Sequence, residues 1–316
     1  MKIFVTQEIP ESGILLLKKK GFEVSVYSND KPIHRKDFLN QIKDCDGLIC
    51  LLTEKIDKEV IDKMKKCKVI ANYAVGFNNI DVEYAKSKGI VVTNTPDVLT
   101  DSTADLTMAL VLACARRITE SEKFVREKKF KGWKPKLFLG VELRDKYFGI
   151  LGAGRIGTAV AKRAAAFGCK LIYYSDVKNV WIEKKLMAKR VSLNSILKKS
   201  DILSVHLPLN KKTYNLLNEE NLPLLKSSAI FVNTARGEIV DEKFLIGMLK
   251  ENKIFAAGFD VYENEPQINP ELFKLKNVIL LPHIGSATLE ARRNMSLLVA
   301  KNVINVLSGK PPITPV

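Results

Sequence analysis

Short apolar runs alternate with amphipathic stretches along the first 93 residues. The short runs predict strands, and the stretches between them, with apolar positions spaced at about 3.6 residues, predict helices. The predicted strands are Lys2–Thr6, Glu23–Tyr27, Gly47–Leu51, Val69–Asn72 and Ile90–Thr93, and the predicted helices are Gly13–Lys20, Arg35–Lys43, Lys58–Lys66 and Val82–Lys86. Strictly alternating strands and helices predict a parallel sheet covered by helices on both faces.

A proline-marked break at Asn94–Asp101 separates this region from the next. From Ser102 to about Val125 the pattern predicts one long helix, which is apolar over more than one stripe. A second subunit is therefore expected to cover part of it. The alternation resumes with six predicted strands, Tyr147–Leu151, Lys170–Ser175, Ile202–His206, Ala229–Asn233, Ile254–Asp260 and Val278–Leu281, and ends with a helix over Leu289–Leu307.

A glycine fingerprint follows the first of these six strands, in the order Gly152, Gly154 and Gly157, and a helical pattern begins at once. Such a turn allows a backbone to approach a pyrophosphate, which the helix N-terminus then attracts. Asp176 ends the next predicted strand, about 20 residues on, where an acid accepts hydrogen bonds from a ribose. The sequence therefore predicts a dinucleotide site, with NAD(H) favoured because Asp176 would repel a 2′-phosphate; the neighbouring Lys178 makes that preference less strict.

These patterns predict an α/β protein with two doubly wound parallel-sheet domains, a flavodoxin-like substrate domain and a Rossmann NAD-binding domain, and an active-site cleft between them. The last helix is too short to form a domain, so we expect it to pack back on the first. The substrate-binding domain is then discontinuous, 1–99 plus 287–316, and the NAD-binding domain is 100–286.

Composition narrows the class of protein. The net charge is +16, but the lysines are spread over the polar faces of predicted helices, so we expect no nucleic-acid partner. No apolar stretch approaches the ~18 residues of a membrane span, and no signal peptide is recognisable. The five cysteines show no metal-ligand spacing, so we expect reduced thiols, no metal site and a cytoplasmic location.

Only three histidines are available for proton transfer near neutral pH, where a free imidazole titrates. His34 lies in a polar loop and is expected at the surface. His206 ends a strand of the nucleotide domain, where a cofactor-lining role and a structural role both remain open. His283 ends the last predicted strand beside the domain boundary and is the candidate acid/base, although position alone leaves a structural role open.

Charged residues that are candidates for the active site lie at the ends of other predicted strands. Arg236 follows a strand, where its guanidinium can clamp a carboxylate, the alternative being a surface ion pair. Asp260 ends the next strand and Glu265 lies beyond it; a carboxylate near His283 would stabilise and orient the imidazolium. Glu263 is a rival for that role and is expected to be exposed.

Two loops of the first domain also lie at the ends of predicted strands. Ala74–Asn79 contains a glycine, Gly76, and can form a nest of backbone N–H groups for a carboxylate, with a plain turn into the next helix as the alternative. Leu51–Thr53, which includes Leu52, can wall the same pocket.

Taken in order, these motifs resemble the D-isomer-specific 2-hydroxyacid dehydrogenases over essentially the whole chain, and within that family the glyoxylate and hydroxypyruvate reductases. The motifs are Asn72–Asp81, Thr100–Asp105, the glycine fingerprint, Asn233–Gly237, Asp260–Tyr262 with Glu265-Pro266, and Pro282–Ser286; Thr93–Asp101 carries the closer likeness. Asp145 stands where the family usually has a turn glycine, which aspartate tolerates.

The resemblance implies reversible, NADH-dependent reduction of a small 2-oxo acid to its D-2-hydroxy acid. Arg236 would hold the substrate carboxylate and carbonyl, His283 would be the acid/base, and Glu265 would pair with it. Val75 and Gly76 would offer backbone N–H groups to the substrate, beside Leu52. The expected cofactor contacts are Thr103, Gly152, Gly154, Arg155, Ile156, Gly157, Asp176, His206, Pro208, Thr213, Thr234, Ala235, Asp260 and Gly285. A homodimer is expected.

Two alternatives remain open. The lysine content would suit a phosphorylated substrate, as in D-3-phosphoglycerate dehydrogenase, although many of those enzymes carry a further regulatory domain. Nucleotide-sensing corepressors share the same scaffold and resemble the enzymes even at the catalytic residues.

Overall fold

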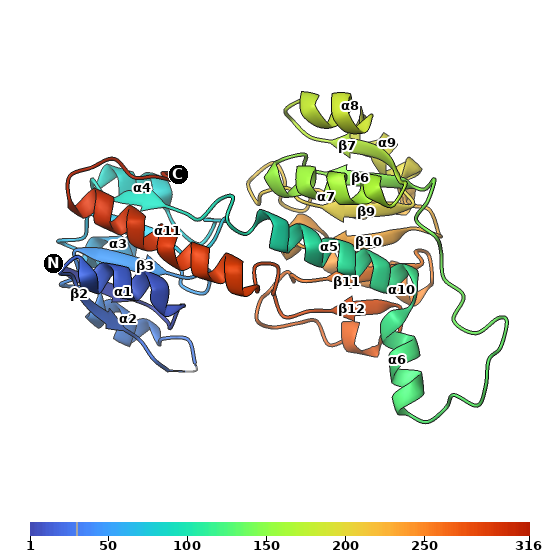
Figure 1. The fold of residues 1–316 in the computed structure, drawn as a ribbon, viewed down its shortest axis with the longest axis horizontal. Helices are drawn as coiled ribbons and strands as arrows, with labels where there is room; N and C mark the ends of the chain where they lie inside the picture. Colours follow the sequence, from blue (N-terminus) through green and yellow to red (C-terminus); the bar gives the residue numbers. More distant parts are fainter. Residues whose placement is uncertain (30) are drawn as a thin grey trace. The chain divides into compact units, whose positions relative to one another are not determined.

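The computed structural model describes residues 1–29 and 31–316 and divides into two compact units. The first unit contains Met1–Leu99 and Ser286–Val316, and the second contains Thr100–Gly285. Each unit is built on one parallel sheet with helices on its faces (Figure 1). The prediction of two parallel-sheet α/β units is confirmed.

The first unit has a five-stranded parallel sheet in the order β2-β1-β3-β4-β5. Its elements in chain order are β1 (Lys2–Val5), α1 (Glu11–Lys19), β2 (Glu23–Val26), α2 (Arg35–Gln41), β3 (Gly47–Cys50), α3 (Lys58–Lys63), β4 (Val69–Asn72), α4 (Val82–Ser87), β5 (Val91–Thr93) and α11 (Leu289–Leu307). Helix α11 returns from the far end of the chain and packs on α1 and β4 (Figure 1). Strands β3 and β4 are buried throughout, as expected of central strands in a sheet covered on both faces.

The second unit has a seven-stranded parallel sheet in the order β12-β11-β10-β9-β6-β7-β8. Its strands are β6 (Tyr147–Leu151), β7 (Lys170–Tyr174), β8 (Lys189–Arg190), β9 (Ile202–Val205), β10 (Ile230–Asn233), β11 (Ala256–Phe259) and β12 (Val278–Leu280). Its α-helices are α5 (Thr100–Ala115), α6 (Ile118–Arg126), α7 (Arg155–Ala166), α8 (Val180–Leu186), α9 (Leu193–Lys199) and α10 (Glu242–Lys250). The strand order reverses at β6, between β9 and β7, and the glycine fingerprint follows β6. Ligands of open α/β sheets bind at such a reversal.

Two expectations about this unit were wrong. The sheet has seven strands rather than six, because the two-residue strand β8 pairs with β7 although Lys189 and Arg190 are exposed. The single helix expected over Ser102–Val125 is two helices, because Arg117 adopts a left-handed conformation with φ of 52° and ends the first.

The apolar faces of α5 are covered mostly within its own unit, where α5 packs against α7, β10 and β11. None of the residues of α6 is buried, and Figure 1 shows α6 and the segment after it extending from the rest of the unit. Among residues 1–29 and 31–316, no helix is long and apolar enough to span a membrane.

Candidate active site

The fingerprint turn meets the steric requirements of a dinucleotide site. Gly152 has φ of 96°, and a Cβ there would lie 2.6 Å from the carbonyl oxygen of His206. A Cβ on Gly157 would lie 2.0 Å from the carbonyl oxygen of Gly152, so this glycine lets helix α7 pack against the turn. A Cβ on Gly154 would meet nothing within 4 Å, so space remains beside the backbone where a pyrophosphate would approach. The residues present therefore fit a nicotinamide dinucleotide.

Helix α7 begins directly after Gly154, and no side chain caps its first turn. Arg155, Ile156 and Gly157 thus supply the first N–H groups of the helix, which is the arrangement that binds phosphates. The side chain of Asn179 donates to the carbonyl oxygen of Ala153 at 2.8 Å and holds the turn from the other side.

Asp176, the predicted ribose contact, follows β7 and is exposed. Arg190, on the edge strand β8, donates to the carbonyl oxygens of Ser175 at 2.7 Å and Asp176 at 2.8 Å. The guanidinium therefore clamps the backbone of the turn that carries Asp176. Arg190 was not predicted, because a strand of two charged residues has no apolar pattern to reveal it.

His206 follows β9, and its ring nitrogen Nε2 lies 2.7 Å from the hydroxyl of Ser204. Burial lowers the pKa of His206 to about 3, so its imidazole stays neutral and carries no proton to a reaction at neutral pH. Its carbonyl oxygen instead faces Gly152 in the fingerprint turn. In the following loop, the Thr213 hydroxyl donates to the carbonyl oxygen of Pro208 at 2.6 Å.

His283 and Glu265 are hydrogen-bonded, with Nδ1 of the imidazole 2.7 Å from Oε2 of the carboxylate. The other carboxylate oxygen of Glu265 accepts the backbone N–H of Tyr262 at 3.0 Å. Burial opposes ionisation of Glu265, but hydrogen bonds from His283 and Tyr262 and the positive charge of Arg236 hold its pKa below the usual value. The carboxylate is therefore charged at neutral pH and can stabilise an imidazolium.

The loop that carries His283 is fixed by the buried carboxylate of Asp260. One of its oxygens accepts the N–H of Ile284 and the other the N–H of Gly285, each at 2.7 Å. The hydroxyl of Thr103 donates to the carbonyl oxygen of Gly285 at 3.0 Å. These bonds hold His283 in the left-handed conformation, with φ of 54°, which costs a residue with a side chain about 1 kcal/mol. Burial raises the pKa of Asp260, and the bonds from Ile284 and Gly285 oppose that rise.

Arg236 lies in the turn after β10, and its carbonyl oxygen accepts from the Asn233 side chain at 2.8 Å. Gly237 follows it, and a Cβ there would lie 1.9 Å from the carbonyl carbon of Tyr262. The arginine turn and the segment leading to Glu265 are thus in direct backbone contact. Burial lowers the pKa of Arg236 while Glu265 and Glu238 oppose the change, and a guanidinium remains charged throughout the working range.

Thr234 and Ala235 complete this turn. The Thr234 hydroxyl lies 2.9 Å from that of Thr107 on α5, and the N–H of Ala235 donates to the Asn233 side chain at 3.0 Å. Side chains from β10, β11 and β12 therefore converge within one unit: Arg236, Asp260, Glu265 and His283 all follow carboxyl ends of neighbouring parallel strands.

In the first unit, the loop after β4 carries Val75 and Gly76, and the loop after β3 carries Leu52, which is partly exposed. Asn79 joins the two loops, because its side-chain amide donates to the carbonyl oxygens of Leu51 at 2.9 Å and Glu54 at 3.1 Å. Both loops thus lie at the carboxyl edge of the five-stranded sheet. This was expected from their positions after neighbouring strands.

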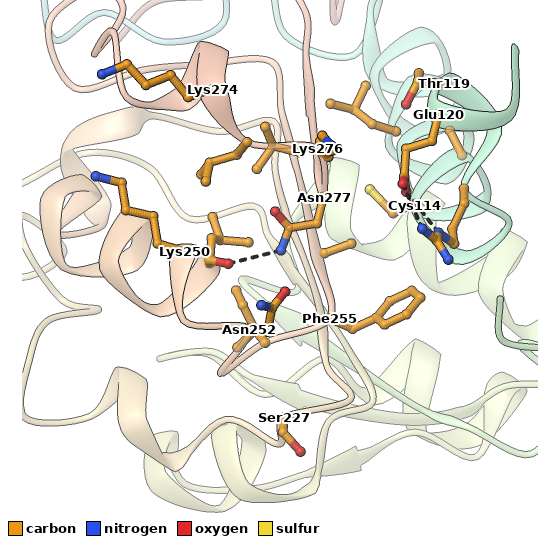
Figure 2. Close-up of a pocket in the computed structure, with 18 residues that line it drawn as sticks. Cys114, Thr119, Glu120, Ser227, Lys250, Asn252, Phe255, Lys274, Lys276 and Asn277 are labelled. Carbon is orange, nitrogen blue, oxygen red and sulfur yellow. Dashed lines mark hydrogen bonds and ion pairs between the residues drawn. The ribbon is translucent and has the colours of Figure 1, made fainter. Parts of the chain in front are cut away.

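A cavity of about 540 Å³ in the second unit contains none of the predicted site residues (Figure 2). It lies at the amino ends of β11 and β12, where Ala256 and Val278 line it, whereas Asp260 and His283 follow the carboxyl ends of these strands. Figure 2 shows the side chains of Lys250 and Lys274 on one side of the cavity; both pair with Glu271. The cavity is therefore separate from the His283–Glu265 pair.

Comparison with known proteins agrees with this arrangement. Residues 108–285 match the family model described as D-isomer specific 2-hydroxyacid dehydrogenase, NAD binding domain. This match covers more than half of the chain, and the chain belongs to that family of nicotinamide-dependent oxidoreductases.

Full-length relatives show which members of the family the chain resembles. The chain is 50% identical to a glyoxylate reductase of Thermococcus litoralis over 98% of this chain and 95% of the relative. A crystal structure of the TT0316 protein of Thermus thermophilus is 40% identical, with a TM-score of 0.94 and complete coverage of both chains. An NADPH-dependent glyoxylate/hydroxypyruvate reductase of Sinorhizobium meliloti, solved with NADP and malonate, is 31% identical with a TM-score of 0.88, over 100% of this chain and 96% of that one.

Proposed function

We propose that this protein reduces glyoxylate or hydroxypyruvate to the corresponding 2-hydroxy acid with NADH, in a reversible reaction. The observation that carries the proposal is the His283–Glu265 pair in the same unit as Arg236 and the glycine fingerprint. The named activity of the Thermococcus litoralis relative, which shares half of its aligned residues with this chain, supports the choice of substrate.

His283 supplies the proton in reduction. Its Nδ1 is engaged by Glu265, so Nε2 is the ring nitrogen that delivers a proton to the carbonyl oxygen of the substrate. A bound nicotinamide supplies the hydride to the carbonyl carbon. Arg236 holds the substrate carboxylate and stabilises the developing oxyanion, which typically contributes a few kcal/mol, about 3.

The first unit carries the other residues that we assign to the substrate. The N–H groups of Val75 and Gly76 donate to the substrate carboxylate, and Leu52 borders the substrate's other end. An apolar side chain at this position suits a short 2-oxo acid better than a phosphorylated one.

For the cofactor, we assign the fingerprint glycines, Arg155 and Ile156 to the pyrophosphate and Asp176 to the ribose. Thr103, Asp260 and Gly285 border the nicotinamide, and the remaining contacts come from His206, Pro208, Thr213, Thr234 and Ala235. NADH is preferred because the Asp176 carboxylate repels a 2′-phosphate. Because the Sinorhizobium relative is NADPH-dependent, both cofactors belong in the assay.

A homodimer is part of the proposal. Apolar side chains stand exposed on α6 and the segment after it: Ile118, Val125, Phe130, Trp133 and Leu139. Several exposed apolar side chains on one segment support an interaction site there. A cytoplasmic location, expected from the sequence, is in keeping with free thiols at all five cysteines.

The test is NADH oxidation, followed by absorbance, with glyoxylate, hydroxypyruvate, pyruvate and phosphohydroxypyruvate at matched concentrations. The proposal requires the highest kcat/KM with glyoxylate or hydroxypyruvate. A preference for phosphohydroxypyruvate would reassign the protein to phosphoglycerate oxidation, and binding of NADH without turnover of any 2-oxo acid would favour a sensing role. Sedimentation at micromolar concentration tests the dimer.

A further inference from the structure

Three consecutive carbonyl oxygens in the loop after β4 are each held by a hydrogen bond. The carbonyl oxygen of Ala74 accepts the backbone N–H of Thr95 at 2.8 Å. That of Val75 accepts from the side chain of Asn94 at 2.8 Å, and that of Gly76 from the side chain of Asn72 at 2.7 Å. Consecutive peptide planes in this loop are therefore fixed by partners outside the loop.

Fixing a carbonyl also fixes the next N–H group, because the two lie on opposite sides of one planar peptide unit. The bonds to Ala74, Val75 and Gly76 thus orient the N–H groups of Val75, Gly76 and Phe77, respectively. Within residues 1–29 and 31–316, none of these three N–H groups donates to a protein acceptor. Unpaired backbone N–H groups are available to donate to an anionic group such as a carboxylate.

The two asparagines are themselves rigidly placed. Asn72 is fully buried at the end of β4, and its side-chain nitrogen also lies 3.3 Å from the side-chain oxygen of Asn79. Asn94 is 8% exposed, and its carbonyl oxygen accepts from the Thr314 hydroxyl at 2.7 Å. Burying an amide costs free energy unless it is paired, so both amides are committed to the loop they hold.

We propose that Asn94 and Asn72 are positioning residues for the substrate: they hold the Val75 and Gly76 carbonyls so that the N–H groups of Gly76 and Phe77 face a carboxylate. This inference rests on the proposed reduction of a 2-oxo acid. It adds the N–H group of Phe77 as a third backbone donor to the substrate carboxylate. It also explains why the buried side chains that contact this loop are the amides of Asn72 and Asn94 rather than apolar groups.

The variants Asn94→Leu and Asn72→Leu test the proposal, since leucine has nearly the shape of asparagine, carries no charge and donates no hydrogen bond. Each should raise KM for glyoxylate and the inhibition constant of oxalate, a non-reacting carboxylate, by about tenfold or more, which corresponds to one lost buried hydrogen bond. The dissociation constant for NADH and kcat at saturating substrate should stay close to wild type. If Asn72→Leu does not fold, Asn94→Leu carries the test alone.

Ser296→Ala is the matched control, because Ser296 is a buried polar residue of the same unit whose hydroxyl bonds Pro10 on another element. It should lower the melting temperature without changing KM or oxalate inhibition. A folded Asn94→Leu protein with wild-type KM and oxalate inhibition would overturn the inference, as would an equal loss of NADH affinity. If wild-type protein binds oxalate in calorimetry but turns over no 2-oxo acid, the proposed function is wrong. The oxalate affinity of the variants would still test the positioning role of Asn94 and Asn72.

Discussion

Glu265 holds His283 through Nδ1 of the imidazole, at 2.7 Å from its carboxylate oxygen. This bond fixes the orientation of the ring and occupies Nδ1, so that Nε2 is the nitrogen we propose as the proton donor. The same carboxylate also accepts the N–H of Tyr262, so it is anchored to the strand end that precedes it. The pair is therefore assembled from the loops after two separate strands, β11 and β12.

Substituting His283 with asparagine should abolish proton transfer while leaving the cofactor site intact. We expect kcat to fall by about 10²–10⁴-fold, the usual contribution of a general acid. NADH affinity, measured by quenching of protein fluorescence, should be unchanged because the fingerprint glycines lie on a different loop. Wild-type kcat in this variant would rule out His283 as the acid.

Replacing Glu265 with glutamine should change how stability depends on pH. The folded-state pKa of Glu265 lies below its ordinary value of 4.5, so its stabilising effect is present above that pH and is lost as pH falls through the lowered value. Wild-type protein should therefore be more stable than Glu265→Gln at pH 7, with the difference shrinking below about pH 4.5. Denaturant midpoints at pH 7 and pH 3.5 measure this; a constant difference would contradict it.

The change Arg236→Lys keeps the positive charge and removes the planar fork that binds a carboxylate at two points. We expect kcat/KM for the 2-oxo acid to fall by about 10²-fold or more. Steady-state kinetics give this value. Equal activity of the lysine variant would mean that the fork makes no specific contact.

Asp260→Asn replaces one acceptor with a donor that faces a backbone N–H. In the wild type the carboxylate accepts the N–H groups of both Ile284 and Gly285, and the variant can accept only one of them. The loop that carries His283 should therefore be less firmly held. We expect the free energy of unfolding to fall by about 1–3 kcal/mol and kcat to decrease. Asp241→Ala, which removes the N-cap of α10, is the control: it should cost about 1 kcal/mol without lowering kcat. Equal kcat losses in the two variants would show that stability alone is responsible.

Asp176→Ser removes the carboxylate that, in our proposal, opposes a 2′-phosphate. Arg190 lies at the same turn, so the ratio of kcat/KM with NADPH to that with NADH should rise by about tenfold. Initial rates with both cofactors give this ratio. No change would mean that another residue sets the preference.

The buried strands of both sheets could be predicted from the sequence, because parallel strands covered on both faces form uninterrupted apolar runs. The break between α5 and α6 was not predicted. The left-handed residue there is Arg117, and neither glycine nor asparagine occupies the position to indicate such a conformation. The edge strand β8 was not predicted for a similar reason. Lys189 and Arg190 show no apolar alternation, and only their pairing with β7 defines them as a strand.

The pairing of His283 with Glu265, rather than with Glu263, agrees with the family resemblance. Position alone could not decide it, because it depends on how two loops meet. The sequence also could not show that Asn72 and Asn94 hold carbonyl oxygens in the loop after β4. Buried asparagines at strand ends resemble ordinary turn residues until their partners are known.

The close fit of Gly237 against Tyr262 limits how this enzyme could be redesigned. Even an alanine would force two main-chain segments apart, and with them the guanidinium and the carboxylate that those segments present. Mutational libraries meant to broaden the range of accepted acids should therefore leave position 237 unchanged and sample the loop around Leu52 instead.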